Sequence, residues 1–481
     1  MNQVPYPHQI VGTNWLVDRL SRFGRALLLD DMGLGKTKQA IDSAALLREK
    51  GIVGNVVVIC PKTLVENWQR EIATNAEGTI VPVLRTDVKV TTKADRIKRI
   101  EQQADWTILH YEAARTLAEN LASIITDRTL VICDEAHALK NQKADVTKAV
   151  VGLLPKMVIL MTGTPIANTP EDAFQPLQIV TFDTAYKSWW AFRKWHLITT
   201  PLQVFTKKFD KKGKAIYRTV EKVSGYRNLE KLEKLLAKYG IRRTMEEVLD
   251  LPPIVFAPRF VELEPEQRQH YDEMKKELRT MVELASGEEL VLKAQDILTQ
   301  VTRLYQIASG ILQIQAGEEY VQHIPSAKLE ALEEIVDELG GQKVIVWVRH
   351  RAVMQRLYKH FAKLNPAQVH GGITDRQNQV DRFNNDPTCK MFLGQLQSAH
   401  QGINLEKNCC HAVFFERMFS PYNNDQATNR IRRIGQTKRQ MIIPIIAART
   451  VDEKLTTLLE KKADWRETIL RDKAQLLDFI G

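Results

Sequence analysis

The chain has 481 residues, of which 44% are hydrophobic and 26% are charged. This composition is typical of a folded globular protein and excludes a disordered chain, and the length allows roughly three domains. No run of about 18 apolar residues occurs, so we expect no membrane-spanning helix and no membrane partner. The five cysteines form no CxxC pair, which predicts reduced thiols in a cytosol-like compartment and no zinc site.

The formal net charge of +10 is concentrated in one segment. Residues 187–243 contain 16 Lys or Arg and 4 Asp or Glu, a net of +12, so the remaining residues sum to −2. The segment is also rich in Trp, Phe and Tyr. A local excess of this kind favours a polyanion-binding surface. The alternative is a solvated basic insertion that packs around a small aromatic core of its own.

Short apolar runs that end in polar or Gly-rich turns occur early and late in the chain. The runs are 26–29, 56–60, 129–133 and 157–161 in the first third, and 343–348, 390–394, 411–415 and 441–446 in the last. Helix-length segments separate them, which is the alternation of buried parallel strands and crossover helices. Between the two sets the chain is basic and helix-like, without this rhythm. We therefore predict an α/β fold with lobes at 1–180 and 326–481 and a mostly helical basic insertion and linker at 181–325. The last helical stretch, from Val451 to about Ile480, is expected to pack back across the lobes as a brace.

The stretch LLLDDMGLGKT, which ends at Thr37, joins an apolar strand to the start of a helix through a Gly-rich turn. Gly33 and Gly35 allow backbone amides to curl around a phosphate, where a side chain would block the approach. Lys36 would reach the β- and γ-phosphates of a nucleotide, and the Thr37 hydroxyl would bind magnesium. Asp30 stands where the general pattern has glycine. Taken alone, the stretch is also compatible with a Gly-rich turn of no function.

The stretch LVICDEAHAL is a second apolar run, and it ends in two carboxylates about 100 residues after the glycine turn. Asp134 at the end of this strand is placed to hold magnesium, mostly through water, and Glu135 beside it could polarise an attacking water. A plain acidic turn is the alternative for the four residues DEAH taken alone. The upstream phosphate loop favours a nucleotide site.

Together these motifs resemble the Swi/Snf-type DEAH-box ATPases of helicase superfamily two, and the resemblance covers nearly the whole chain. The first part of the chain contributes PYPHQIVGTNWL, DDMGLGKT, VICPKTLVENWQREI and LMTGTPIAN, and the last part contributes VIVWVRHR, VHGG and DQATNRIRRIGQ. The stretch QLQSAHQGINL, followed by FFERMFSPY, is closer to the fork-remodelling, strand-annealing branch of that family.

The resemblance implies two RecA-like P-loop NTPase lobes with ATP and Mg²⁺ bound between them. Gln9 would read the adenine, and the loop would bind the phosphates through Gly33, Leu34, Gly35, Lys36 and Thr37. Arg430 and Arg433 would act as arginine fingers on the γ-phosphate, with Gln426 helping to orient the site; such a cation can be worth about 10³–10⁵ in rate. If the stretch 429–436 is helical, the two arginines share one face. The alternative for them is a solvated surface position.

The activity implied by the resemblance is ATP-dependent movement along double-stranded DNA, or remodelling of it, including forked or branched DNA. Backbone contacts carry no sequence information, so we expect sequence-independent and salt-sensitive binding. Two alternatives stay open: a strand-separating helicase acting on DNA or RNA, and an ATP-gated DNA-binding clamp. We expect a cytoplasmic protein of bacterial or viral origin, or a nuclear one if the source is eukaryotic.

The basic segment leads to a test of DNA binding. Neutralising five of its lysines together is expected to weaken DNA affinity and to flatten its salt dependence; these are Lys207, Lys208, Lys211, Lys212 and Lys214. Each lost phosphate contact should reduce the slope of log K against log salt by about 0.9. Titrations of duplex DNA at several salt concentrations measure this slope. An unchanged slope would make these lysines ordinary surface residues.

Overall fold

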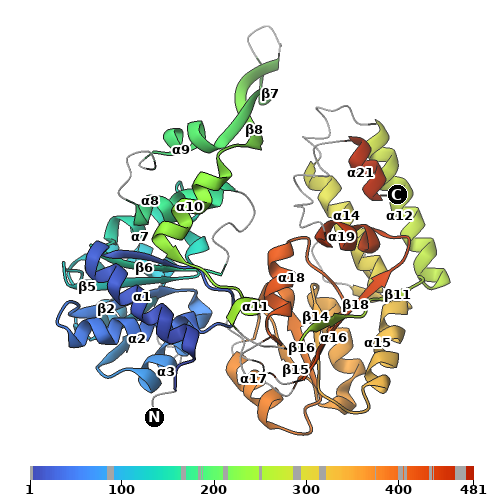
Figure 1. Ribbon diagram of the computed structural model, residues 1–481. Helices are drawn as coiled ribbons and strands as arrows, with labels where there is room; N and C mark the ends of the chain where they lie inside the picture. The colour runs from blue at the N-terminus through green and yellow to red at the C-terminus, as the bar shows by residue number, and fades with distance from the viewer. Residues whose placement is uncertain are drawn as a thin grey trace. The chain divides into compact units, whose positions relative to one another are not determined.

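The computed structural model describes most of the chain, which forms two compact units (Figure 1). The described residues are 4–83, 92–163, 170–181, 186, 188–209, 215–248, 252–284, 294–313, 321–373, 375–398, 405, 409–432, 436, 438–460 and 473–480. Unit 1 comprises Met1–Val248 and unit 2 comprises Leu249–Gly481. The segment 181–325, expected as an insertion, is thus shared between the two units.

Unit 1 is built on a parallel sheet of seven strands in the order β3-β4-β2-β5-β6-β1-β9. The strands are β1 (Arg25–Leu28), β2 (Asn55–Cys60), β3 (Ile80–Pro82), β4 (Trp106–His110), β5 (Thr129–Asp134), β6 (Met157–Met161) and β9 (Gly240–Ile241). Every one of the four early apolar runs is a strand of this sheet. Their side chains are buried on both faces, which explains why the sequence shows continuous apolar runs instead of alternation.

Helices cover both faces of the sheet in unit 1 (Figure 1). One face packs against α1 (Pro7–Phe23), α2 (Lys36–Glu49) and α3 (Val65–Asn75). The other packs mainly against α5 (Tyr111–Thr116), α6 (Ala118–Ala122), α7 (Asp145–Leu153), α8 (Phe174–Val180) and α10 (Leu229–Tyr239). Shorter or more peripheral helices are α4 (Lys93–Ile100), α9 (Trp189–His196) and α11 (Met245–Val248).

An antiparallel hairpin occupies part of the region that the sequence predicts to be helical. Its strands are β7 (Leu197–Phe209) and β8 (Ala215–Tyr226). The helical expectation is therefore wrong for these residues. Threonine, valine and aromatic residues recur in both strands, and these favour strands over helices. The lysines of the salt-dependence test lie outside the described side chains.

Unit 2 is built on a second parallel sheet, in which six strands follow the order β10-β18-β17-β14-β16-β15 and β11 also pairs with β18. The strands are β10 (Ile254–Phe256), β11 (Arg259–Val261), β14 (Val344–Val348), β15 (Ala367–Val369), β16 (Met391–Gln395), β17 (His411–Phe414) and β18 (Gln440–Ala447). All four late apolar runs are strands here, which confirms two α/β lobes. A separate small ribbon joins β12 (Ile311–Gln313) to β13 (Val321–His323).

Two helix layers and a separate helical cluster complete unit 2. One face of the sheet packs against α15 (Ala327–Glu338) and α16 (Arg351–His360), and the other against α17 (Arg376–Asn385) and α18 (Pro421–Thr428). The helical cluster contains α12 (Pro265–Leu284), α14 (Ala294–Ala308), α19 (Val451–Glu460) and α21 (Lys473–Ile480) (Figure 1). The described parts of the expected brace therefore pack against α12 and α14 within unit 2.

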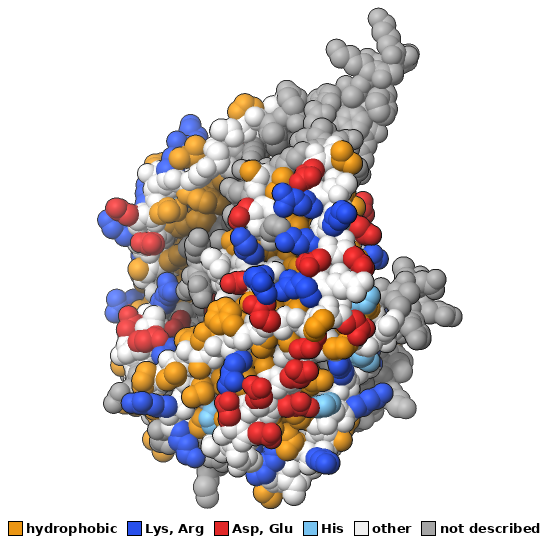
Figure 2. Space-filling view, turned by 90° about the vertical axis from the view of Figure 1, so that its right-hand side faces the viewer, with side chains coloured by type: hydrophobic (Ala, Val, Ile, Leu, Met, Phe, Trp, Pro, Cys, Tyr) orange, Lys and Arg blue, Asp and Glu red, His pale blue; other side chains and the backbone are white. Residues whose placement is uncertain are grey.

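The face shown in Figure 2 carries acidic and basic side chains interspersed with apolar ones. Among the described residues, no helix combines the length and apolar character needed to cross a bilayer. All five cysteines are buried and unpaired.

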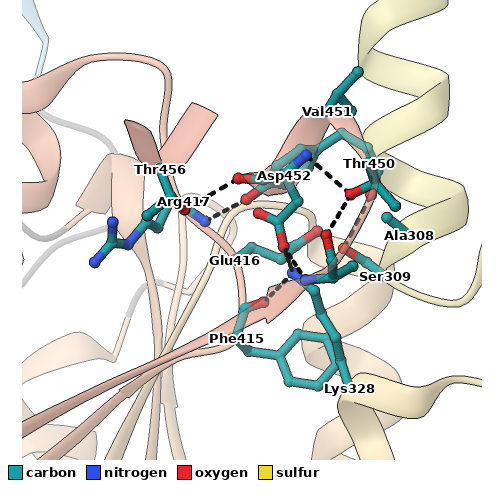
Figure 3. A network of polar contacts seen from close by, with 12 residues as sticks. Ala308, Ser309, Lys328, Phe415, Glu416, Arg417, Thr450, Val451, Asp452 and Thr456 are labelled. Carbon is teal, nitrogen blue, oxygen red and sulfur yellow. Dashed lines mark hydrogen bonds and ion pairs between the residues drawn. The ribbon is translucent and has the colours of Figure 1, made fainter. Parts of the chain in front are cut away.

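A buried ion pair joins the sheet of unit 2 to its helical cluster (Figure 3). Lys328 Nζ lies 2.5 Å from Asp452 Oδ2, and the two side chains are 0% and 2% exposed. The ammonium also donates to the Phe415 carbonyl at 3.0 Å, and the carboxylate accepts from the Ala447 amide at 2.9 Å. Because Lys328 is in the first turn of α15 and Asp452 in the first turn of α19, this pair fixes the two helices to each other.

Breaking this pair should destabilise unit 2. Lys328→Met leaves the Asp452 carboxylate buried without its cation, and we expect a loss of about 3–5 kcal/mol in the free energy of unfolding. The double variant Lys328→Met/Asp452→Asn should recover much of that loss, since no unpaired charge remains. Urea unfolding of the full chain measures both.

The matched control is on α19, the helix that contains Asp452. Lys454 forms an exposed pair with Asp478 at 3.3 Å, and Lys454→Met should change the stability by less than about 1 kcal/mol. A Lys328→Met variant as stable as the Lys454→Met variant would contradict a stabilising role for the buried pair.

Candidate nucleotide-binding site

The predicted phosphate loop connects β1 to α2 in unit 1. Gly33 and Gly35 have φ values of +86° and +72°, in the left-handed region that glycine adopts without strain. A Cβ atom on Gly35 would lie only 2.1 Å from Gln9 Nε2. Lys36 and Thr37 are the first two residues of α2. The loop therefore has the glycine-dependent backbone and the helix N-terminus that favour a bound anion.

Lys36 lies folded over the backbone of this loop. Its ammonium donates to the carbonyl oxygens of Asp30 at 2.7 Å and Asp31 at 3.1 Å. Gly163, just after β6, approaches closely, since a Cβ there would lie 3.4 Å from Lys36 Nζ. The cation is thus held beside the loop by neutral acceptors.

The first turn of α1 contacts the loop directly. Gln9 Nε2 donates to the Leu34 carbonyl at 3.3 Å, and Gln9 Oε1 accepts from the Tyr6 amide at 3.0 Å. His8 Nε2 lies 3.0 Å from the same Leu34 oxygen. The structure therefore places Gln9 at the loop, while its recognition of adenine stays a prediction. His8 was not predicted, although its place beside Gln9 in PYPHQIVGTNWL was a usable signal.

Asp134 is the last residue of β5 and is buried. Its Oδ2 accepts from Trp68 Nε1 at 2.8 Å, and its Oδ1 accepts from the Glu135 amide at 2.9 Å. Burial raises the pKa of Asp134 to about 6 and the charge of Glu135 acts in the same direction, whereas the Trp68 hydrogen bond and the charge of Lys36 lower it. Because the charge of Lys36 acts on the pKa of Asp134, the glycine loop and the strand-end carboxylates interact electrostatically. Trp68, which orients this carboxylate, was not predicted.

Glu135 has an unusual backbone conformation. Its φ of +50° lies in the left-handed region, which costs a non-glycine residue about 1–2 kcal/mol. Its Oε2 lies 3.1 Å from His137 Nδ1. Strain of this kind is concentrated at functional sites, where the surrounding structure maintains it. The conformation therefore supports a chemical role for this carboxylate.

These residues fit a nucleotide with magnesium. The carboxyl ends of parallel strands lie at one edge of a sheet, so the loop after β1 and the carboxylates after β5 share that edge. Among the described residues, no group of three or more His, Cys, Asp or Glu side chains forms a metal site. Magnesium does not require such a group, because it keeps several waters and binds through one or two protein ligands and the phosphates. Thr37 and Asp134 are the residues that would hold it.

Unit 2 brings together two of the three residues predicted for it. Gln426 is fully buried in α18, and its Oε1 accepts from Arg430 Nη2 at 3.2 Å. Helix α18 ends at Thr428, so the helix considered for 429–436 does not include Arg430. Arg433 lies outside the described residues. Within the part of the chain that is described, Gln426 Nε2 has no hydrogen-bond partner.

Several characterised proteins are similar to this chain over almost its whole length. The TATA-binding protein-associated factor mot1 of Schizosaccharomyces pombe is 24% identical, over 98% of this chain and 27% of its own length. The putative ATP-dependent helicase/translocase YwqA of Bacillus subtilis is 28% identical, over 97% and 49%. The DNA annealing helicase and endonuclease ZRANB3 of Mus musculus is 26% identical, over 96% and 40%. The chain thus spans between a quarter and a half of the length of these relatives.

One solved structure and two family models are also similar to this chain. The Sulfolobus solfataricus SWI2/SNF2 ATPase core, determined with double-stranded DNA, matches 99% of this chain and 97% of its own, with 23% identity and a TM-score of 0.42. The helicase conserved C-terminal domain matches residues 327–435, and the SNF2-related domain matches residues 8–310. Since the latter match covers well over half of the chain, this protein belongs to the SNF2-related family of helicase-like ATPases.

Proposed function

We propose that this protein is an ATP-dependent translocase that moves along double-stranded DNA or remodels it. The observation that carries the proposal is the pairing, at one edge of the unit 1 sheet, of a glycine-dependent loop with Lys36 and a buried Asp134 followed by a strained Glu135. Membership of the SNF2-related family supports the same activity.

We assign separate roles in nucleotide binding and hydrolysis to the residues of unit 1. The amides of 33–37 and the Lys36 ammonium bind the phosphates, and Gln9 orients the adenine. When bound through Thr37 and Asp134, magnesium supplies charge neutralisation at the phosphates. Glu135 orients the attacking water. From unit 2 we assign to Arg430 the cation that balances the charge on the transferring phosphoryl group, with Gln426 holding its guanidinium, and we assign the same role to Arg433.

Double-stranded DNA is the substrate that we propose for this motor. Among the relatives, YwqA is named a helicase/translocase and ZRANB3 a DNA annealing helicase. The net charge of +12 over residues 187–243, four basic for every acidic residue, suits a phosphate backbone. Because backbone contacts position a protein without reading bases, binding should not depend on sequence.

The first test compares polynucleotides as activators of ATP hydrolysis. We expect duplex DNA to raise the ATPase rate above the values obtained with single-stranded DNA or RNA, and forked DNA to be at least as effective as linear duplex. Triplex displacement on linear duplex should then follow ATP hydrolysis, because it reports translocation without strand separation.

The same assays separate the alternatives. Stimulation by RNA alone, or rapid separation of a blunt duplex, would favour a strand-separating helicase. Nucleotide-dependent DNA binding without triplex displacement would favour a clamp.

The second test concerns the water-orienting residue. Glu135→Gln should keep ATP binding, because the phosphate loop is untouched, while turnover falls by about 10²–10⁴, the range that a positioned general base contributes. Fluorescent nucleotide titration and steady-state ATPase assays measure the two effects. Glu49→Gln, an exposed change at the end of α2, is the control. Normal turnover in the Glu135→Gln variant would assign activation of the water to another group.

A further inference from the structure

A buried carboxylate lies at the start of the phosphate loop. Asp30, at the position where the general phosphate-loop pattern has glycine, is 0% exposed. Its Oδ1 accepts from Arg243 Nε at 3.0 Å, and its Oδ2 accepts from Arg243 Nη2 at 2.5 Å. A guanidinium that meets both oxygens in this way is strongly oriented as well as strongly bound. The two residues are 213 positions apart in the sequence.

Other polar groups complete the network around this pair. Gln39, also fully buried, donates to Asp30 Oδ2 at 3.0 Å and accepts from Arg243 Nη2 at 2.7 Å. Arg243 Nη1 donates to the His8 carbonyl. A Cβ atom on Gly12 would lie 1.8 Å from Gln39 Oε1 and 2.5 Å from Arg243 Nη2. The glycine in α1 is therefore a condition for this close arrangement.

The backbone of residues 241–245 is also hydrogen-bonded to the loop and to the end of β1. The Leu29 amide donates to the Ile241 carbonyl at 2.8 Å, and the Asp31 amide donates to the Arg243 carbonyl at 3.0 Å. The Met245 amide donates to Asp31 Oδ2 at 3.2 Å. The segment 241–245 thus extends the pairing of β9 with β1 along the loop, and it lies just before Val248, the last residue of unit 1.

The charge of Asp30 matters for a phosphate ligand. Lys36, the residue assigned to the phosphates, already donates to the Asp30 and Asp31 carbonyls. Without Arg243, the Asp30 carboxylate would be a buried, uncompensated anion beside the loop. It would repel phosphate, and it would compete with phosphate for the Lys36 ammonium.

We propose that Arg243 is a positioning residue of the nucleotide site, which neutralises Asp30 and couples phosphate binding to the order of segment 241–245. The inference rests on the proposed binding of ATP at this loop. Arg243 contacts the loop through the Asp30 carboxylate and the Asp31 amide, so its effect on the nucleotide would pass through Asp30 and through the backbone that carries Lys36.

Nucleotide titrations of the full chain test the electrostatic part. Arg243→Met should weaken binding of a fluorescent ATP analogue by about tenfold or more, because the unpaired carboxylate stays in place. Asp30→Asn/Arg243→Met should bind within about threefold of the wild type, since removing both charges removes the repulsion. Arg242→Met, at the exposed neighbouring arginine, is the matched control and should bind normally.

A purely structural role predicts a different outcome. It would lower the melting temperature of the Arg243→Met variant but leave its nucleotide affinity unchanged at temperatures where the variant is folded. Equal affinity of the folded Arg243→Met and Arg242→Met variants would overturn the inference, as would an affinity loss that Asp30→Asn does not rescue. If the wild type binds no ATP analogue, the proposed function fails together with the inference.

Hydrogen exchange of the wild-type chain tests the coupling without a variant. Saturation with the ATP analogue should slow exchange at the amides of Asp31 and Met245, which donate the hydrogen bonds between the loop and segment 241–245, in peptides covering 29–35 and 240–248. Nucleotide-dependent protection of the loop without any change at 240–248 would overturn the coupling while leaving ATP binding intact.

Discussion

A carboxylate or ammonium withdrawn from water stays ionised in a folded protein only with an opposite charge and further hydrogen bonds close by. Among the described residues, each unit contains a pair of this kind that joins segments far apart in the sequence. In unit 1, Asp30 and Arg243 hold the phosphate loop to the segment that leaves the unit. In unit 2, Lys328 and Asp452 hold α15, which precedes β14, to α19, which follows β18. Buried pairs of this kind contribute little net stability compared with apolar packing, but removing one partner is costly. Their effect here is to fix the geometry of two chain segments.

The position of the loop determines what the other residues of unit 1 can do. Since β1, β6 and β5 are adjacent and parallel, the ends of these strands bring Lys36, Gly163 and Asp134 to one edge of the sheet. Burial of Asp134 raises its pKa, and the indole of Trp68 fixes one of its oxygens. The site is therefore assembled from strand ends whose relative positions follow from apolar packing, and its polar groups have few alternative orientations.

The sequence could predict the features whose signal is local. The apolar runs revealed four of the seven strands in each sheet. Glycine spacing revealed the loop, because a run or a turn is specified by neighbouring residues. Contacts between distant segments leave no such signal. The sequence therefore placed Arg243 only in the basic insertion and linker, and it marked Asp30 only as a departure from the phosphate-loop pattern. The hairpin β7–β8 was missed because residues 181–325 were interpreted as one helix-like segment without a strand rhythm. Helix α18 ends at Thr428, so the condition under which Arg430 and Arg433 would share a helical face is not met at Arg430.

The two cations at the loop differ in the acceptors that they meet, and this difference has a mechanical consequence. Arg243 already has a carboxylate, an amide oxygen and a backbone carbonyl as partners, so a phosphate offers it nothing stronger. Lys36 has only two neutral carbonyls, and a charged phosphate oxygen is a better acceptor for an ammonium. We therefore expect an arriving phosphate to draw Lys36 away from the loop backbone and to leave Arg243 in place. If Lys36 moves, the carbonyls of Asp30 and Asp31 lose a donor, while the Asp31 amide and the Asp30 carboxylate keep Arg243 as their partner. In the proposed coupling, changes in the loop would pass to segment 241–245 through bonds that nucleotide binding has no reason to break.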